Sequence, residues 1–184
     1  FWMMTRQVVL SLLSLGLAVA FANLVPRETY GAYKYVLAAS LLLETFTLTE
    51  MNTALTRAVA QGFDGSLSIV SRTRMRWGLL GSLVSLGIAA YYGVQGNGVQ
   101  AMAFLIVAVF LPLKSPLSVY QPFWQGKKRF DLSAKLSVYV SLWSTAVLLL
   151  TILLTDNLLW LIGVYLGATT AGVVVAYAYT AARA

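Results

Sequence analysis

The chain contains neither cysteine nor histidine. Disulfides, thiolate nucleophiles, imidazole general bases and Cys/His metal sites are therefore excluded within these residues. Acidic residues are also scarce: six Asp and Glu occur among 184 residues, without the paired spacing that is typical of a metal or glycosyl-transfer site. The sequence has no phosphate-binding loop and no zinc-protease helix motif. We predict that the chain is not an enzyme and holds no metal or cofactor.

Long apolar stretches dominate the sequence. Hydrophobic residues make up 59% of it and charged residues only 10%, far from the composition of a soluble domain. A transmembrane helix needs about 20 mainly apolar residues. The helices predicted on this basis are 8–25, 33–60, 77–92, 99–113 with an extension to 124 left open, 136–155 and 158–182. We predict an all-α polytopic membrane protein of about six transmembrane helices.

Positive charge alternates between the gaps that separate these helices. All but two of the 13 Lys and Arg residues fall on one side, and the exceptions are Arg27 and Lys34. Because cytoplasmic loops retain positive charge during insertion, both ends of the chain are predicted to be cytoplasmic. The net charge of +7 does not predict nucleic-acid binding, since the basic residues flank apolar helices.

The chain begins at Phe1 and stops at Ala184 directly after an apolar helix. We interpret residues 1–184 as one transmembrane lobe, embedded in the lipid bilayer. We also expect this lobe to be a fragment of a longer chain that carries a second lobe.

The basic residues of the two large cytoplasmic loops have two interpretations. Setting the orientation of the helices is the simpler one. The other is contact with a phosphate, either of an anionic lipid or of a pyrophosphate headgroup. The candidates for such headgroup contact are Arg72, Arg74, Arg76, Lys127, Lys128 and Arg129.

Two carboxylates fall inside the predicted helix 33–60. A charge near the bilayer centre costs about 2.5 to 3.5 kcal/mol on insertion scales, so such residues usually face a protein interior or a wet cavity. On a continuous helix with 100° per residue, a polar stripe would descend one face toward the cytoplasm. Its members are Thr47, Glu50, Thr53 and Arg57, with Glu44 at the edge. We interpret these five residues as one wall of a substrate cavity; the alternative is an interhelical hydrogen-bonding seam.

Small residues predict close helix packing at several points. Gly163 and Gly167 form a GxxxG pair, and Gly78 with Gly81 marks another close approach. We assign these residues a structural role.

The stretch 22–67 carries a family resemblance. Residues 25–33 read VPRETYGAY, residues 52–62 read NTALTRAVAQG, and the later turn 126–130 reads GKKRF. With the order and spacing of the predicted helices, these elements resemble the N-terminal part of bacterial polysaccharide export flippases. These are the Wzx-type O-antigen transporters of the multidrug/oligosaccharidyl-lipid/polysaccharide superfamily. Related sequences tend to have Gly where this chain has Glu50, so the resemblance assigns no role to that residue.

The resemblance implies a transporter of the inner (cytoplasmic) membrane. Its substrate would be an oligosaccharide on a polyprenyl pyrophosphate, moved by alternating access between two lobes. Polar helix faces would shelter the sugar, and a basic inner rim would attract the pyrophosphate. Three alternatives stay open. A cation-coupled drug or metabolite antiporter of the same superfamily could use Glu44 for ion coupling; a glycan-assembly enzyme would need larger outer loops; a scaffold subunit would transport nothing.

Overall fold

The computed structural model describes residues 2–183, which form helices joined by short connections and contain no strand. The elements are α1 (Trp2–Leu24), α2 (Arg27–Glu44), a 3₁₀ turn η1 (Thr45–Thr47), α3 (Met51–Ala60), α4 (Ser66–Val94), α5 (Gly98–Leu117), α6 (Tyr120–Gly126), α7 (Phe130–Leu154) and α8 (Leu158–Ala181). Among these residues, five helical segments are long and apolar enough to cross a membrane. The prediction of an all-α polytopic membrane protein is confirmed.

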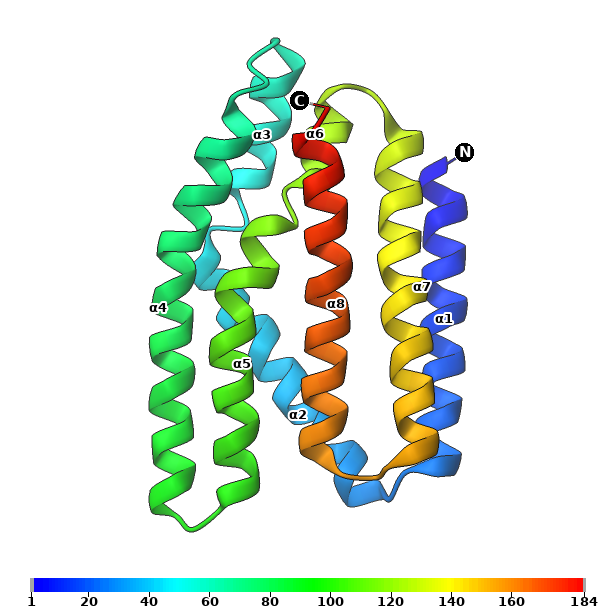
Figure 1. Cartoon of the computed structure of the whole chain (residues 1–184), viewed down its shortest axis with the longest axis vertical. Coiled ribbons are helices and arrows are strands. Elements are labelled where there is room, and N and C mark those ends of the chain that lie inside the picture. The colour runs from blue at the N-terminus through cyan, green and yellow to red at the C-terminus, as the bar shows by residue number, and fades with distance from the viewer. Residues whose placement is uncertain (1, 184) are drawn as a thin grey trace.

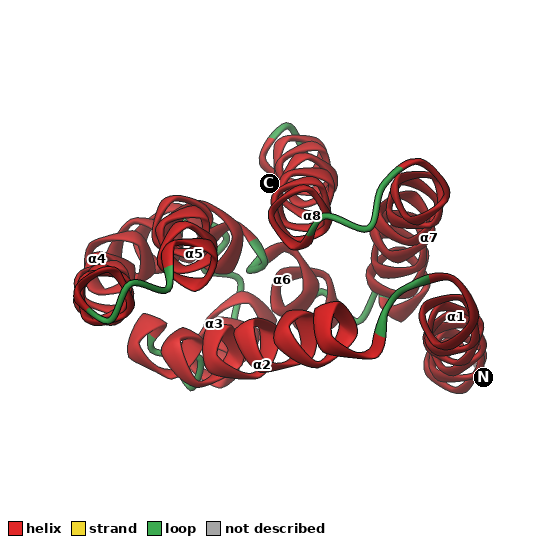
Figure 2. Ribbon diagram, turned by 90° about the horizontal axis from the view of Figure 1, so that it is seen from below, coloured by secondary structure: helices red, strands yellow, loops and turns green. Residues whose placement is uncertain are grey.

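The five candidate spans stand side by side in a curved row. Along the row the contacts run from α4 to α5, then to α8, α7 and α1, as Figure 1 shows. Helix α2 is not part of this row: it crosses it obliquely and packs against α4, α5 and α8. Seen from below, α2 and α3 form a second layer along one side of the row (Figure 2). The second of the six predicted spans, 33–60, thus corresponds in its first part to a tilted helix that packs along one side of the row.

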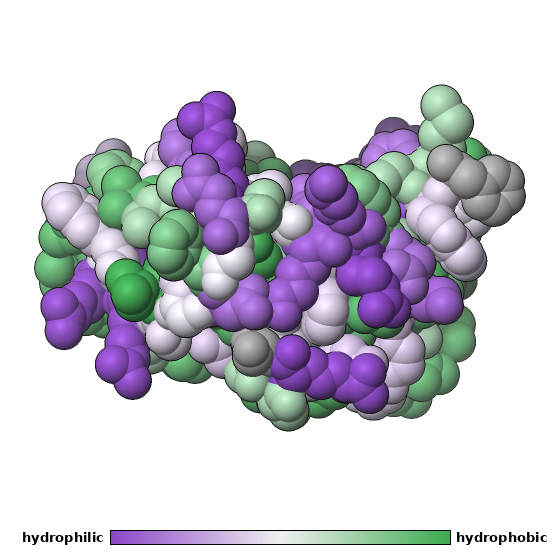
Figure 3. Space-filling model, turned by 90° about the horizontal axis from the view of Figure 1, so that it is seen from above, coloured by the Kyte–Doolittle hydropathy of each residue, from purple (hydrophilic) through white to green (hydrophobic). Residues whose placement is uncertain are grey.

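The two ends of the bundle differ in polarity. The start of α1, the end of α8 and the short helices α3 and α6 lie together at the upper end in Figure 1. Figure 3 looks down on this end and shows hydrophilic residues gathered there. The opposite end carries short turns, where Asn97 and Asn157 cap α5 and α8 by accepting bonds from the amides of Gln100 and Leu159. We call the upper end the basic end.

The predicted continuous helix 33–60 is wrong. Helix α2 ends at Glu44, one 3₁₀ turn follows, Leu48 adopts the left-handed conformation with φ 55°, and α3 begins at Met51. Threonine side chains supply a local reason. The hydroxyls of Thr45 and Thr47 donate to the carbonyls of Leu42 and Glu44, at 2.6 and 2.7 Å. Such bonds compete with the helical pattern.

Other helix boundaries also differ from the predicted ones. Helix α4 begins at Ser66 instead of residue 77, so three arginines that were expected in a loop lie on a helix. Helix α5 continues through Pro112 and Pro116 to Leu117, and α6 follows as a separate short helix. The extension toward residue 124, which the sequence left open, corresponds to this separate helix and not to a continuation of α5.

Apolar side chains pack in two main clusters. The larger lies between the oblique α2 and the row, where Val36, Phe104 and Leu161 are fully buried. The smaller lies at the basic end and joins α3 to α6 through Leu55 and Phe123. The oblique layer is therefore held to the row at both ends by burial of apolar surface, the main favourable term in folding.

Glycines permit the closest helix contacts. A Cβ on Gly81 would lie 3.0 Å from the carbonyl oxygen of Leu43, so this prediction of close packing holds. A Cβ on Gly163 or Gly167 would lie at ordinary distances of 3.9 and 3.7 Å from α5 side chains. The tightest approach involves Gly126, whose added Cβ would come within 2.7 Å of the Thr56 carbonyl oxygen.

Candidate functional site

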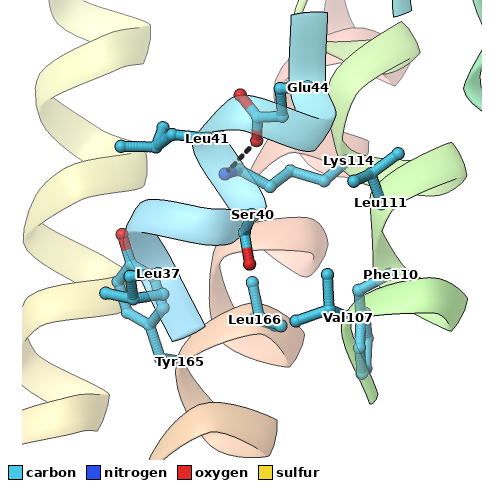
Figure 4. A pocket seen from close by; sticks show the side chains of 10 residues that line it. All are labelled: Leu37, Ser40, Leu41, Glu44, Val107, Phe110, Leu111, Lys114, Tyr165 and Leu166. Atoms are coloured by element: carbon cyan, nitrogen blue, oxygen red, sulfur yellow. Dashed lines mark hydrogen bonds and ion pairs between the residues drawn. The ribbon is translucent and has the colours of Figure 1, made fainter. Parts of the chain in front are cut away.

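An ion pair lies between the two layers. Lys114 Nζ on α5 is 2.7 Å from Glu44 Oε1 at the end of α2, and each side chain is 24% exposed. Figure 4 shows the pair at one end of a hollow formed by α2, α5 and α8. The rest of this hollow is mostly apolar, with Leu37, Phe110 and Leu166 among its walls, and its volume is about 80 Å³. We call it the α2/α5/α8 hollow.

The position of Lys114 corrects one expectation. It was counted among the cytoplasmic loop charges, but it lies inside α5 between Pro112 and Pro116. Its ammonium bonds to the Glu44 carboxylate, so Glu44 has a partner on another helix. An ion pair within a membrane bundle is expensive to maintain and is typical of a functional position.

A second charged group is completely enclosed. Arg74 on α4 is 1% exposed. Its guanidinium donates to the Thr47 carbonyl oxygen at 3.1 Å, to Asn52 Oδ1 at 2.8 Å and to Ser115 Oγ at 3.0 Å. The hydroxyls of Thr47 and Ser115 are 2.7 Å apart. This network ties α4 and α5 to the irregular segment between α2 and α3.

Two predicted site residues are therefore structural. Arg74 was expected to contact headgroups at the surface, but its donors are used inside the protein, so this expectation is wrong. Thr47 was expected to line the cavity and is instead fully buried beside Arg74. The reason is the break in the helix: an open carbonyl at Thr47 needs a donor, and Arg74 provides one.

Two other predicted cavity residues share a polar pocket. Thr53 and Arg57 on α3 face Gln121 and Gln125 on α6, with Asn52 beside them, around a volume of about 420 Å³. Amides, a hydroxyl and a guanidinium line this space at the basic end. We call it the α3/α6 pocket.

The geometry of the α3/α6 pocket depends on the tight contact of its two helices. Thr56 Oγ1 lies 2.9 Å from the Asn52 carbonyl oxygen and 3.2 Å from the Pro122 carbonyl oxygen, and these two acceptors share its single hydroxyl hydrogen. The contact of Gly126 with α3 keeps the helices this close.

Glu50 departs from the predicted stripe. It is exposed and precedes α3 as its first flanking residue; it lines neither the α3/α6 pocket nor the α2/α5/α8 hollow. With the helix broken, the five residues do not share one continuous face. The stripe divides into Glu44 in the hollow, Thr47 in the buried network, and Thr53 with Arg57 in the pocket.

The remaining headgroup candidates differ in availability. Arg72, Arg76 and Lys128 are exposed, and Arg72 borders a groove of about 250 Å³ between α4, α5 and α8. Lys127 pairs with Asp64 at 3.0 Å and lies over the Phe123 ring. Arg129 pairs with Asp131 at 3.2 Å. Arg72, Arg76 and Lys128 take part in none of the ion pairs recorded among residues 2–183.

Sequence reasoning missed Lys114, Asn52, Gln121 and Gln125. A signal existed for Lys114, since a lysine between two prolines interrupts an apolar run. The amide residues carry no comparable signal, because they become neighbours only through the contact of α3 with α6. Within the described part of the chain, no group of three or more acidic, His or Cys residues could hold a metal ion.

A family model described as "Polysaccharide biosynthesis protein" matches residues 1–183. The chain belongs to this polysaccharide biosynthesis family. Comparisons with curated proteins and with solved structures gave no match. Membership supports a role in polysaccharide biosynthesis or export for this multi-pass membrane protein, in a family that is typically transporter-like and not catalytic. The resemblance inferred from the sequence is confirmed at this level, and the Wzx-type assignment stays a prediction.

Proposed function

We propose that this protein translocates a polyprenyl-pyrophosphate-linked oligosaccharide across the cytoplasmic membrane. The observation that carries the proposal is the Glu44–Lys114 ion pair in a hollow between the layers of a membrane bundle, in a chain of the polysaccharide biosynthesis family. Sugar hydroxyls are both donors and acceptors, so a carboxylate beside an ammonium offers complementary partners to them. The same pair offers no hydrogen bond to a purely apolar substrate.

The α3/α6 pocket suits the first contact with the headgroup. Its volume of about 420 Å³ lies within the range of roughly 300 to 1,000 Å³ that is usual for small-molecule sites. The Arg57 guanidinium matches a phosphate in two-pronged geometry. Gln121 and Gln125 offer amide donors and acceptors to a sugar. Exposed Arg72, Arg76 and Lys128 at the same end would raise the local concentration of an anionic headgroup.

Passage of a sugar chain requires the α2/α5/α8 hollow to widen, because about 80 Å³ is too small for it. The broken connection between α2 and α3 is suited to this movement. Transporters commonly place discontinuous helices beside their substrate sites and move one repeat against the other. We assign the widening to α2, which the irregular segment 45–50 separates from α3. A second lobe would complete the pathway, with both ends of this lobe in the cytoplasm.

The proposal is tested by measuring which leaflet holds the lipid-linked oligosaccharide. Cells that lack the protein should accumulate finished oligosaccharide on the cytoplasmic leaflet. Complementation with Lys114→Gln or Arg57→Gln should lower translocation about tenfold per molecule of protein in the membrane, which corresponds to roughly 1.4 kcal/mol. Arg183→Gln removes a charge at the same end, outside both sites, and should restore translocation fully.

Unchanged lipid content and sidedness in the deleted strain would refute the proposal. Sodium- or proton-dependent export of a drug by the purified protein would favour the antiporter instead. The pairing of Glu44 with Lys114 argues against that alternative, because an ion-coupling carboxylate must be free to exchange its cation.

A further inference from the structure

Helices α1 and α7 enclose a groove on the far side of the bundle from α4. The two helices are neighbours and start at the same end (Figure 1). Arg6 and Val9 line the groove from α1, and Lys135, Val138 and Leu142 line it from α7, around a volume of about 330 Å³. Within each helix these positions are three, four or seven apart, which places them on one face. We call this space the α1/α7 groove.

The mouth of the α1/α7 groove carries two positive charges. The ion pairs recorded among residues 2–183 include neither Arg6 nor Lys135. The nearest acid along α7, Asp131, is paired with Arg129. Arg6 Nε is buried and has no hydrogen-bond partner in the described part of the chain. Within residues 2–183, therefore, no recorded ion pair neutralises the charge at the mouth.

The mouth also has an aromatic side chain that is typical of a membrane interface. Lys135 Nζ lies 5.2 Å from the centre of the Trp2 ring, and tryptophan is enriched at the level of lipid headgroups. The two basic residues therefore lie at the depth where a lipid phosphate is found.

Below the mouth the groove becomes apolar. At 1.5 Å per residue, Val9 lies about 4.5 Å deeper than Arg6, and Leu142 about 10 Å deeper than Lys135. A cationic mouth above an apolar channel is complementary to a phosphate that carries a hydrocarbon chain. Neither a free phosphate nor an uncharged lipid would use both parts.

We propose that the α1/α7 groove binds one anionic glycerophospholipid from the leaflet at the basic end. The phosphate lies between Arg6 and Lys135, and one acyl chain follows Val9, Val138 and Leu142. This lipid holds α1 against the bundle, since Phe21 is the only buried residue recorded in Trp2–Leu24. The groove lies apart from both the α2/α5/α8 hollow and the α3/α6 pocket, so the occupant is a resident lipid and not the translocated substrate.

The test is native mass spectrometry of the intact purified protein with phosphatidylglycerol and phosphatidylcholine of identical acyl chains. The wild type should retain one phosphatidylglycerol in preference to phosphatidylcholine. Each basic residue near a membrane surface contributes about 1 kcal/mol to binding, so Arg6→Gln with Lys135→Gln should weaken phosphatidylglycerol binding roughly 30-fold and leave phosphatidylcholine binding unchanged. Arg183→Gln, in the turn that follows α8 at the same end, should bind both lipids as the wild type does.

A second variant tests the apolar part of the groove without removing a charge. Val138→Trp fills the apolar channel and keeps both charges, and it should also lose the tightly bound phosphatidylglycerol. Equal retention of the two lipids by the wild type would overturn the proposal. So would wild-type phosphatidylglycerol binding by the double variant, or a groove that retains no lipid because another part of the protein or a second copy covers it. These results do not depend on translocation, whose failure is read in the leaflet assay alone.

Discussion

Replacement of Arg74 by methionine should destabilise the protein strongly. The substitution keeps an unbranched apolar stem and removes the guanidinium from a site that is 1% exposed. It leaves the Thr47 carbonyl oxygen, Asn52 Oδ1 and Ser115 Oγ without this donor. Buried polar groups that lose their partner have lost their hydrogen bonds to water and have no protein hydrogen bond to offset that loss. The effect should fall on the junction of α2 and α3, which the three bonds hold to α4 and α5.

The magnitude follows from counting the bonds with good geometry. Three lie between 2.8 and 3.1 Å, and the fourth, to Thr47 Oγ1 at 3.5 Å, is too long to contribute much. Side-chain hydrogen bonds in membrane proteins average about 0.6 kcal/mol and reach about 1.7. The three together are worth about 2 to 5 kcal/mol. For a chain of this size that corresponds to a loss of about 6 to 15 °C in Tm.

The assay is thermal unfolding of the purified protein in mild detergent, followed by tryptophan fluorescence at a fixed scan rate. Arg76→Met is the matched control, because Arg76 lies on the same helix and is exposed; its Tm should change by no more than about 2 °C. An Arg74→Met protein that melts within 2 °C of the wild type would refute the reasoning. It would mean that the irregular segment does not depend on this arginine.

Two further predictions concern stability in the same assay. Gly126→Ala places a methyl group 2.7 Å from the Thr56 carbonyl oxygen and should lower the free energy of unfolding by about 1 to 3 kcal/mol. Gly87→Ala, whose new methyl group meets nothing within 4 Å, should be neutral or stabilising. Equal effects of the two substitutions would contradict the close contact of α3 and α6. The destabilisations caused by Lys114→Gln and by Glu44→Gln should add up to more than the destabilisation caused by the double variant, with a coupling of about 0.5 to 3 kcal/mol. Strict additivity would mean that the 2.7 Å pair is not energetically coupled.

Much of the outer architecture was predictable before any tertiary contact was known. The positions of α1, α7 and α8 follow from apolar runs of membrane-spanning length, and the crowding of basic groups at one end follows from their alternation along the chain. The site was predicted only in part. Thr53 and Arg57 do line a polar pocket, but the face that was to join them to Glu44 and Thr47 does not exist, because Leu48 leaves the right-handed helical conformation.

The sequence by itself determined the class of the protein, because hydropathy and charge add up locally along the chain. A long apolar helix is stable in a membrane whatever its neighbours are, because its backbone hydrogen bonds are satisfied within the helix. The tertiary structure alone decided which polar groups meet. Lys114 finds Glu44 across 70 residues, and Arg74 reaches Thr47 across 27. The identity of each partner depends on how α2 crosses the row of helices and on the irregular turn that separates α2 from α3. A charged residue in an apolar helix predicts that a polar partner is present, because an unpaired charge in the membrane is costly. Only the packing of the helices decides which residue is that partner.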